Sequence, residues 1–424
     1  MTAPRPSLWH HRDFLRLWAG DSISQIGTMV SLIAMPLLAI KVLDAVPFEV
    51  GLLTTFETLA FLLVGLPAGA WVDRLRRRNV LIAGDVGRAL LLGSLPLAWY
   101  LDVLTLTQLY AVALLTGVLT VFFDVAYQSY LPSLVGRDHL VEGNAKLEAS
   151  RAVSQIAGPS VGGGLVQWLT APYAVLVDAA SYLWSAIWIG AISTREERPE
   201  RVPDRHLVRE IREGLNFVLR HRLLRAITAT TGTSNLFSTI LNTAFIIVLA
   251  DQAQLDLSGG TIGLVFTVGS IGGLFGAIAA ERVARRFGQG PTIWLSILVG
   301  APFTLITPLV QRDWTLWAVA ACWAVVSFSV VVYNITQVSF RQGLCPERLL
   351  GRMNATIRFL VWGTMPLGGL LGGVLGSTIG VRPTMWVGAI GMALAFLPAF
   401  LSPLRTMREL PTSYDPEAAA PATR

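Results

Sequence analysis

The chain has 424 residues, of which 53% are hydrophobic and 14% are charged, whereas soluble domains carry about 25% charged residues. This composition excludes an ordinary soluble protein and indicates a membrane protein with many spans. Two cysteines, Cys322 and Cys345, are too few for a disulfide framework, and neither they nor the histidines have a metal-ligand spacing. We therefore expect no metal site.

The first part of the chain contains six long apolar runs, with centres near residues 28, 60, 90, 116, 157 and 182. Each is long enough to cross a bilayer core, which takes roughly 20 apolar residues. No small-residue cleavage site follows a short apolar core at the start, so we expect the first run to be retained as a span. Residues 1–193 are predicted to form an N-terminal bundle of six helices.

A polar break from 194 to 222 separates this bundle from six further runs, centred near residues 237, 270, 299, 325, 363 and 390. Apolar residues recur at helical spacing among arginines from Leu207 to Leu219, which predicts an amphipathic helix at the membrane surface, or a solvated linker helix. Residues 223–402 are predicted to form the C-terminal six-helix bundle. The Pro/Ala-rich stretch 403–424 predicts a disordered tail.

Basic residues are distributed unequally between the two sides of the predicted membrane. One side carries most of the arginines and both termini, and the other carries only Lys41, Arg312 and Arg382. The positive-inside rule therefore places both termini in the cytoplasm. Topology and contact with anionic lipid explain the net charge of +6. Nucleic acid is not an expected partner, because no aromatic and basic binding face is present.

The two halves of the chain repeat each other. Asp73, at the end of the second run, corresponds to Glu281 at the end of the eighth, 208 residues later. Pro159 corresponds to Pro366 in a second pair of similar stretches. Two six-helix halves in the same orientation are typical of transporters built from parallel repeats.

The loop GAWVDRLRRR, between the second and third runs, resembles a signature of the major facilitator superfamily, Gly-x-x-x-Asp-Arg-x-Gly-Arg-Arg. It is carried by Gly69, Asp73, Arg74, Arg77 and Arg78, and Arg76 stands where the family usually has glycine. Through VFFDVAYQSYLP, GPSVGGG and PERLLGRMNATIRF the chain is similar, over essentially its whole length, to the branch of macrolide-efflux, enterobactin-exporter and related actinobacterial drug-efflux proteins. The resemblance implies an all-α fold of twelve transmembrane helices, in two six-helix bundles around a cavity that opens alternately to each side.

Asp73 meets the negative end of a helix dipole, so it needs a neutralising cation or the N-terminus of another helix. Arg77 and the segment 352–358 are available partners, and Asp124 is a second acid that can share the arginine. The resemblance implies that this loop holds the two halves together on the cytoplasmic side while the cavity faces outward. The predicted gate residues are Gly69, Asp73, Arg74, Arg77, Arg78 and Asp124. The alternative is that the arginines only set the topology.

Small residues at helical spacing predict close helix contacts. They are Gly65 and Gly69 on the second run, and Gly158, Gly162 and Gly163 around Pro159 on the fifth. Proline inside a helix also produces a bend. The stretch GPSVGGG resembles a signature of proton-coupled exporters, although the glycines upstream in that signature are replaced here by Ser154 and its neighbours.

Acids inside spans are costly and usually functional. We predict Asp21, Glu57 and Asp124 as proton-coupling residues, and a satisfied hydrogen bond between helices is the alternative reading of Asp21 and Glu57.

Two other acidic sites are expected to be structural. Asp85 and Arg88 lie one turn apart, which predicts an ion pair. Asp178 can be satisfied by neighbouring hydroxyls such as Ser181.

The predicted substrate-cavity residues are Gln25, Asn235, Asn242, Tyr333 and Gln337. A large apolar cavity with few polar anchors suits lipophilic compounds. We expect a monomeric, proton-coupled exporter of small amphipathic molecules, such as a drug, an antibiotic or a secreted metabolite, with the proton gradient as its energy source and no cofactor.

A bacterial inner membrane is the expected location, because Lys41 and Lys146 are the only lysines among 33 basic residues, and this arginine excess favours a GC-rich bacterial genome. The alternatives are a nutrient importer or uniporter of the same fold, and a membrane receptor or scaffold that transports nothing. An enzyme is not expected, because no constellation of nucleophile, base and oxyanion donors is visible.

Overall fold

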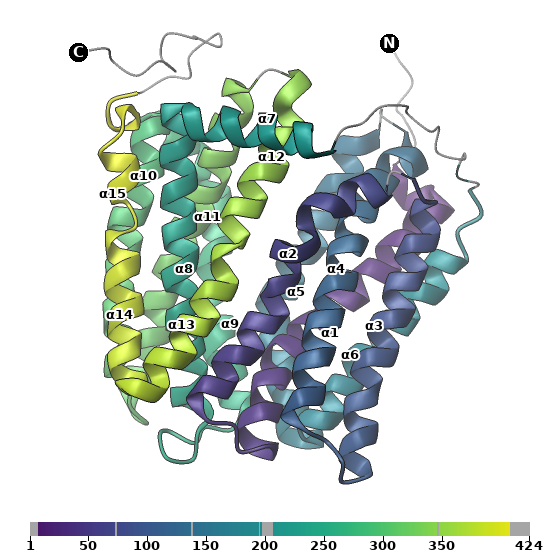
Figure 1. Ribbon diagram of the computed structural model, residues 1–424, viewed down its shortest axis with the longest axis vertical. Helices are drawn as coiled ribbons and strands as arrows, with labels where there is room; N and C mark the ends of the chain where they lie inside the picture. Colours follow the sequence, from purple (N-terminus) through teal and green to yellow (C-terminus); the bar gives the residue numbers. More distant parts are fainter. Residues whose placement is uncertain are drawn as a thin grey trace. The chain divides into compact units, whose positions relative to one another are not determined.

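The computed structural model describes residues 7–72, 74–136, 139–194, 196, 207–345 and 347–407. Regular structure in these residues is helical throughout, without a strand (Figure 1). Eleven helical segments are long and apolar enough to cross a membrane. The helix α5 (Leu140–Leu169) has 30 residues and supplies the twelfth, with Glu142, Lys146 and Arg151 in its more polar first half. The predicted all-α fold of twelve spans is confirmed.

The helices belong to two compact units. Unit 1 comprises Met1–Asp44, Leu63–Pro203 and Ser258–Thr267, and unit 2 comprises Ala45–Leu62, Asp204–Leu257 and Val268–Arg424. The helix α2 (Pro47–Val72) therefore begins in unit 2 and ends in unit 1, whereas α9 (Gly259–Phe287) begins in unit 1 and ends in unit 2.

Four further helices of unit 1 accompany α5: α1 (Arg12–Val42), α3 (Arg77–Tyr100), α4 (Leu106–Val135) and α6 (Ala171–Gly190). The helix α1 packs on α5 and α6, and α3 packs on α4 and α6. At one end of the unit Phe14, Tyr130 and Ile189 are buried in a common apolar core. The helix α4 begins after Thr105, whose hydroxyl accepts a hydrogen bond from the Gln108 amide at 3.3 Å, as is common at an N-cap.

Unit 2 is built around α8 (Arg222–Ala250), which packs on α13 (Thr364–Thr378) and α14 (Val381–Leu394). The helix α11 (Trp314–Leu344) packs on α10 (Gln289–Gly300) and on the 3-10 helix η3 (Ala301–Leu309). The short α15 (Leu397–Phe400) and η4 (Pro403–Arg405) follow α14.

Three of the predicted spans are interrupted in unit 2, and the one centred near 390 changes from α14 to α15 at Ala395 and Phe396. The run centred near 363 consists of α12 (Glu347–Trp362) and α13, and Gly363 lies at the break. Pro366 stands in the first turn of α13, where the missing amide hydrogen costs nothing because no carbonyl partner is available there. The run centred near 299 likewise changes from α10 to η3 just before Pro302.

The helix α7 (Leu207–Arg220) covers the segment for which the sequence predicts an amphipathic helix. Figure 1 shows it running crosswise to α8, near the start of α12. Glu213 of α7 pairs with Arg352 of α12, and Gly214 allows the close approach, because a Cβ there would lie 3.1 Å from the Arg352 carbonyl oxygen. Close backbone contact and an ion pair therefore both hold α7 against α12.

The junctions that precede α6 and α14 have the same backbone conformation. Thr170 has φ 73° and ψ 162°, and Gly380 has φ 92° and ψ 159°. Pro172 and Pro383 follow at the start of the next helix. The internal repeat thus extends to the turns, but Thr170 carries a side chain in a region that is essentially restricted to glycine, so this junction is strained.

In one close helix contact inside each unit, a glycine of one helix faces a glycine of the other. In unit 1 a Cβ on Gly259 of α9 would lie 2.8 Å from the carbonyl oxygen of Gly163 on α5, and the Ser160 and Thr267 hydroxyls lie 2.7 Å apart. In unit 2 a Cβ on Gly373 of α13 would lie 3.0 Å from the Cα of Gly51 on α2. We call these contacts the α5–α9 seam and the α2–α13 seam.

The predicted close contacts on α5 are confirmed, whereas those on α2 are not. A Cβ on Gly162 would lie 2.9 Å from the Cα of Val30, and Gly158 lies against Met29, so both glycines face α1. Pro159 lies inside the continuous helix α5. By contrast, a Cβ on Gly65 or Gly69 would meet no described atom within 4 Å. Within unit 1, therefore, no described helix packs closely on Gly65 or Gly69.

Candidate functional site

The interior of unit 1 contains charged side chains from several helices that are long enough to cross a membrane. Asp21 of α1 is 4% exposed, Asp85 and Arg88 of α3 are 0% and 4% exposed, and Asp178 of α6 is 1% exposed. Asp124 of α4 is partly buried and lies within electrostatic range of Arg88 and Asp21. We call these five residues the buried charge cluster.

Arg88 is the central cation of the buried charge cluster. It forms an ion pair with Asp85, as the one-turn spacing predicts. Its guanidinium carbon lies 4.3 Å from the centre of the Phe123 ring and 4.1 Å from that of Tyr182. Both rings present a negative face to the cation, and the site excludes water, so this cation–π attraction is of the stronger kind.

Asp178 is bound by hydroxyl groups, as the sequence predicts. The Ser181 hydroxyl donates to Asp178 Oδ1 at 3.2 Å, and the Ser31 hydroxyl of α1 donates to Oδ2. One turn further along both helices, the hydroxyls of Thr28 and Tyr182 lie 2.9 Å apart. Hydroxyl groups therefore link α1 to α6 beside the arginine.

Three residues predicted for different roles meet at Asp21. The amide nitrogen of Gln25 donates to Asp21 Oδ1 at 3.4 Å, Tyr127 lies beside the same carboxyl group, and Asp124 lies within electrostatic range. Arg151 of α5 supplies a more distant positive charge. The structure thus brings Asp21, Asp124 and Gln25 into one region of unit 1.

Glu57 does not belong to this cluster. It lies on the part of α2 that belongs to unit 2, is partly buried, and makes no hydrogen bond or ion pair with any described residue. One turn further on, Phe61 packs edge-on against Trp362 with 4.6 Å between ring centres. Glu57 is therefore an acid in an apolar segment beside aromatic packing.

The predicted cavity residues of unit 2 fall into two groups. Asn235 donates to the Val361 carbonyl at 3.4 Å and Asn242 to the Ser238 carbonyl at 2.8 Å, so both amides bind backbone. Tyr333 and Gln337 lie one turn apart on α11 and are 3% and 4% exposed.

The two members of the second group differ in their bonding. The Tyr333 hydroxyl is bonded to the Thr231 hydroxyl. The buried amide oxygen of Gln337 has no partner among the described residues.

The signature loop leads to an acid that the sequence analysis missed. Glu196 accepts hydrogen bonds from the backbone amides of Arg77 at 3.1 Å and Arg78 at 3.2 Å, and so binds the N-terminus of α3. The Arg77 side chain lies 3.9 Å from the same carboxylate. A carboxylate at a helix N-terminus also complements the helix dipole. The only sequence signal is the acidic pair that follows the sixth run.

Arg78 binds the C-terminus of a helix, α6. Its guanidinium donates to the carbonyls of Ile189, at 3.2 Å, and Gly190, which are the last carbonyls of α6. Arg74 is exposed, and Asp73 lies outside the described residues. In unit 1 Arg77 and Arg78 therefore join the start of α3 to the end of α6 and the residues after it.

Asp13 is a second missed acid, at the start of α1. It accepts hydrogen bonds from the backbone amides of Ser193 at 3.2 Å and Thr194 at 2.9 Å, and from the Thr194 hydroxyl at 2.6 Å. Asp13 and Glu196 together hold the residues after α6 against unit 1. Across the described residues, no three His, Cys, Asp or Glu side chains are grouped as metal ligands.

A family model of the Major Facilitator Superfamily matches residues 17–365 and 231–422. The chain therefore belongs to the Major Facilitator Superfamily, and it is a membrane transporter, not an enzyme. It is similar to the multidrug efflux pump Tap of Mycolicibacterium fortuitum, with 27% identity over 406 residues that cover 92% of this chain and 95% of Tap. It is also similar to the enterobactin exporter EntS of Escherichia coli O1:K1 / APEC, with 23% identity that covers 81% of this chain and 80% of EntS.

Solved structures agree on the fold. The nucleoside transporter NupG matches with a TM-score of 0.73 at 12% identity, covering 92% of this chain and 98% of NupG. A bacterial homologue of the iron transporter ferroportin, in its inward-facing state, matches with a TM-score of 0.71 at 16% identity, covering 92% of this chain and 98% of that protein. At these identities the likeness establishes the fold alone.

Proposed function

We propose that this protein is a proton-coupled exporter of small amphipathic molecules, such as a drug, an antibiotic or a secreted metabolite. It works by alternating access as a monomer in a bacterial inner membrane, with both termini in the cytoplasm. The similarity to Tap and EntS supports the direction of transport, because both are described as exporting proteins.

The observation that carries proton coupling is the charge imbalance of the buried charge cluster. Asp85, Asp124 and Asp178 lie within electrostatic range of Arg88, and Asp21 lies within electrostatic range of Arg151 and Asp124, so these residues include more acids than arginines. Uncompensated charges are costly at low dielectric, so the acids share protons as a coupled set. A motion that exposes Asp21 or Asp124 to water releases a proton, and return to the closed interior takes one up.

Glu57 is the second coupling candidate. It has no partner to hold it ionised among the described residues, and it lies in an apolar segment of α2. Its protonation state therefore depends chiefly on whether water reaches it.

The gate assignment of the signature loop completes the proposal. Glu196 and α6 anchor Arg77 and Arg78 in the described conformation, and we assign Asp73 to the contact between the two halves when the cavity faces outward. Asp73→Asn is expected to reach the membrane in normal amount and to lose transport. Normal transport by that variant would contradict the assignment of Asp73 to the gate.

The test uses inverted membrane vesicles with an imposed pH gradient, read by a fluorescent amine, and a panel of antibiotics and dyes. A substrate that dissipates the gradient only when the protein is present shows proton antiport. Asp21→Asn and Glu57→Gln are expected to abolish this response. Asp102→Asn, a matched change at an exposed acid in the loop between α3 and α4, is expected to retain it.

Substrate flux without proton movement in the wild type would favour the uniporter. A nutrient taken up with the gradient would favour the importer. No flux in wild type or variants, across a chemically broad panel, would favour the receptor or scaffold.

A further inference from the structure

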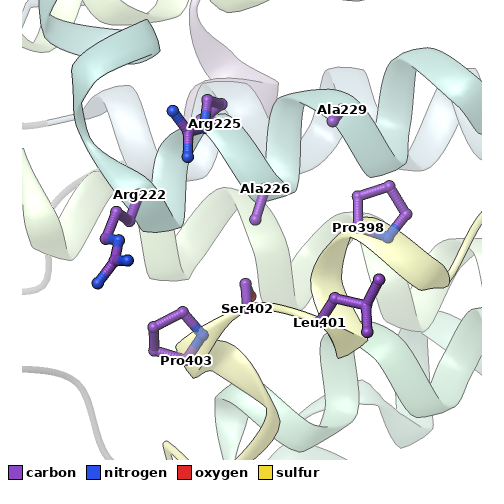
Figure 2. Close-up of a pocket in the computed structure, with 8 residues that line it drawn as sticks. All are labelled: Arg222, Arg225, Ala226, Ala229, Pro398, Leu401, Ser402 and Pro403. Atoms are coloured by element: carbon purple, nitrogen blue, oxygen red, sulfur yellow. The ribbon is translucent and has the colours of Figure 1, made fainter. Parts of the chain in front are cut away.

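A cavity of about 430 Å³ lies at one end of unit 2, far along the chain from the buried charge cluster. The first turns of α8, from Arg222 to Ala229, form one wall, and residues 398–403 after α14 form the other. Figure 2 shows the lining residues of α8 on one side and those of residues 398–403 on the other.

The lining of this cavity changes in character from one end to the other. Arg222 and Arg225 lie toward one end in Figure 2, and Ala229 and Pro398 lie toward the other, with Leu401 beside them. One end is therefore cationic and the other is apolar, as a ligand with a charged head and a hydrocarbon chain requires.

The charges of the two arginines are not balanced by any residue that the structure describes. Neither guanidinium makes a hydrogen bond or ion pair with a described residue, whereas Arg78, Arg88 and Arg352 all do. The helix they begin adds partial positive charge, because its N-cap residue His221 makes no side-chain capping bond and its first turn contains no acid. This end of the cavity is thus suited to an anion.

The position of the cavity matches the edge of a bilayer. The membrane-crossing segment of α8 begins at Arg222, and the segment that contains α14 and α15 ends at Phe400. Leu401, at the rim of the cavity, is 78% exposed. An apolar side chain that projects beside arginines at this level is suited to contact with acyl chains.

We propose that this cavity binds one anionic phospholipid, with the phosphate held by Arg222 and Arg225 and an acyl chain lying along Ala229, Pro398 and Leu401. Arginine suits the phosphate because its planar guanidinium donates two parallel hydrogen bonds to it. The inference does not depend on the direction of transport. It uses the proposed membrane orientation for one point, which is that the lipid comes from the cytoplasmic leaflet.

The test is native mass spectrometry of the full-length protein in detergent, titrated with dioleoyl phosphatidylglycerol or dioleoyl phosphatidylcholine. The wild type is expected to bind the first lipid about 30-fold more tightly, since each basic residue near an anionic lipid contributes about 1 kcal/mol. The double variant Arg222→Gln/Arg225→Gln is expected to lose this preference. Arg285→Gln/Arg286→Gln, which removes the same charge at the exposed end of α9, is expected to keep it.

Two further arms identify the occupant. Ala229→Trp fills the apolar end without changing charge, so it is expected to weaken phosphatidylglycerol binding, and unchanged binding would overturn the proposal. Inorganic phosphate at millimolar concentration is expected not to displace the lipid, and displacement would assign the site to a free anion. A variant that ends at Met407 is expected to bind as the wild type does. Lipid preference in that variant alone would assign the cavity to residues 408–424, which contain Glu409, Asp415 and Glu417, instead.

Discussion

The guanidinium carbon of Arg88 lies 4.1 Å from the centre of the Tyr182 ring, which joins α3 to α6 inside unit 1. Tyr182 in turn is bonded to Thr28 of α1, and Asp85 neutralises the arginine from its own helix. The ring face therefore connects Arg88 of α3 to α6, and the hydroxyl bond extends this connection to α1. The ion pair with Asp85 and the contact with the Tyr182 ring offset the cost of burying the positive charge of Arg88 in the membrane interior.

The first prediction concerns this pairing. Arg88→Met leaves Asp85 buried without a counterion, and we expect a loss of about 3–5 kcal/mol in stability, as is typical when one partner of a buried pair is removed. Asp85→Leu/Arg88→Met removes both charges and is expected to recover most of the loss. Thermal unfolding in detergent measures both. If the double variant is no more stable than the single one, the pair is not the source of the effect.

The second prediction concerns the α2–α13 seam. A Cβ on Gly51 would overlap the Gly373 backbone, so Gly51→Val forces the helices apart. Overpacking of this kind costs about 1–3 kcal/mol. Gly65→Val is the matched control on the same helix, because a Cβ there meets no described atom within 4 Å. We expect transport to fall in the first variant and to stay near the wild-type rate in the second, at equal amounts in the membrane. Equal rates would show that the seam is not tightly packed.

The third prediction concerns the strained junction before α6. Thr170 is exposed and has φ 73°, so Thr170→Gly relieves backbone strain and loses little packing. Strain of this kind costs about 1–3 kcal/mol. Glycine offsets about 0.5–1 kcal/mol of the gain, because it loses more conformational entropy on folding than threonine does. We expect a net gain of about 1 kcal/mol in thermal stability. The reverse change at the repeat-related position, Gly380→Thr, is expected to destabilise. A loss of stability in Thr170→Gly would contradict the inference that the backbone at Thr170 is strained.

The fourth prediction concerns pH. His221, just before α8, is 4% exposed, and burial lowers the pKa of its imidazole below the ordinary value. The unfolded chain therefore binds the proton more readily than the folded protein does, so the stability contribution of His221 is complete above the unfolded pKa and is lost as pH falls below it. We expect the stability difference between wild type and His221→Asn to shrink from pH 7.5 to about pH 5. A difference that is constant with pH would mean that the imidazole does not titrate on unfolding.

Long apolar runs and loop charges are enough to predict twelve helical spans, because both signals are properties of continuous sequence. They do not predict the interruptions at Gly363 and before Pro302, because hydrophobicity does not change there. The lack of a close neighbour for Gly65 and Gly69 within unit 1 is missed for a related reason. Glycine spacing permits close packing but does not require a neighbour.

The contacts of the site also divide into those that the local sequence predicts and those that it does not. The pairs Asp85–Arg88 and Asp178–Ser181 are predictable because each lies within one helical turn. Glu196 lies 118 residues from Arg78, and Asp13 lies 180 residues from Ser193, so no local pattern connects them. The same holds for the rings around Arg88, which come from α4 and α6.

The α5–α9 seam has a consequence for how the protein is made. Residues 258–267 complete unit 1, yet the ribosome delivers them only after α6, α7 and α8. The glycine surface of α5 around Gly163 therefore lacks its α9 neighbour while these helices are being inserted into the membrane. The N-terminal half is consequently not a finished folding unit on its own. A gene split within residues 197–206 should give stable protein only when both fragments are synthesised in the same cell.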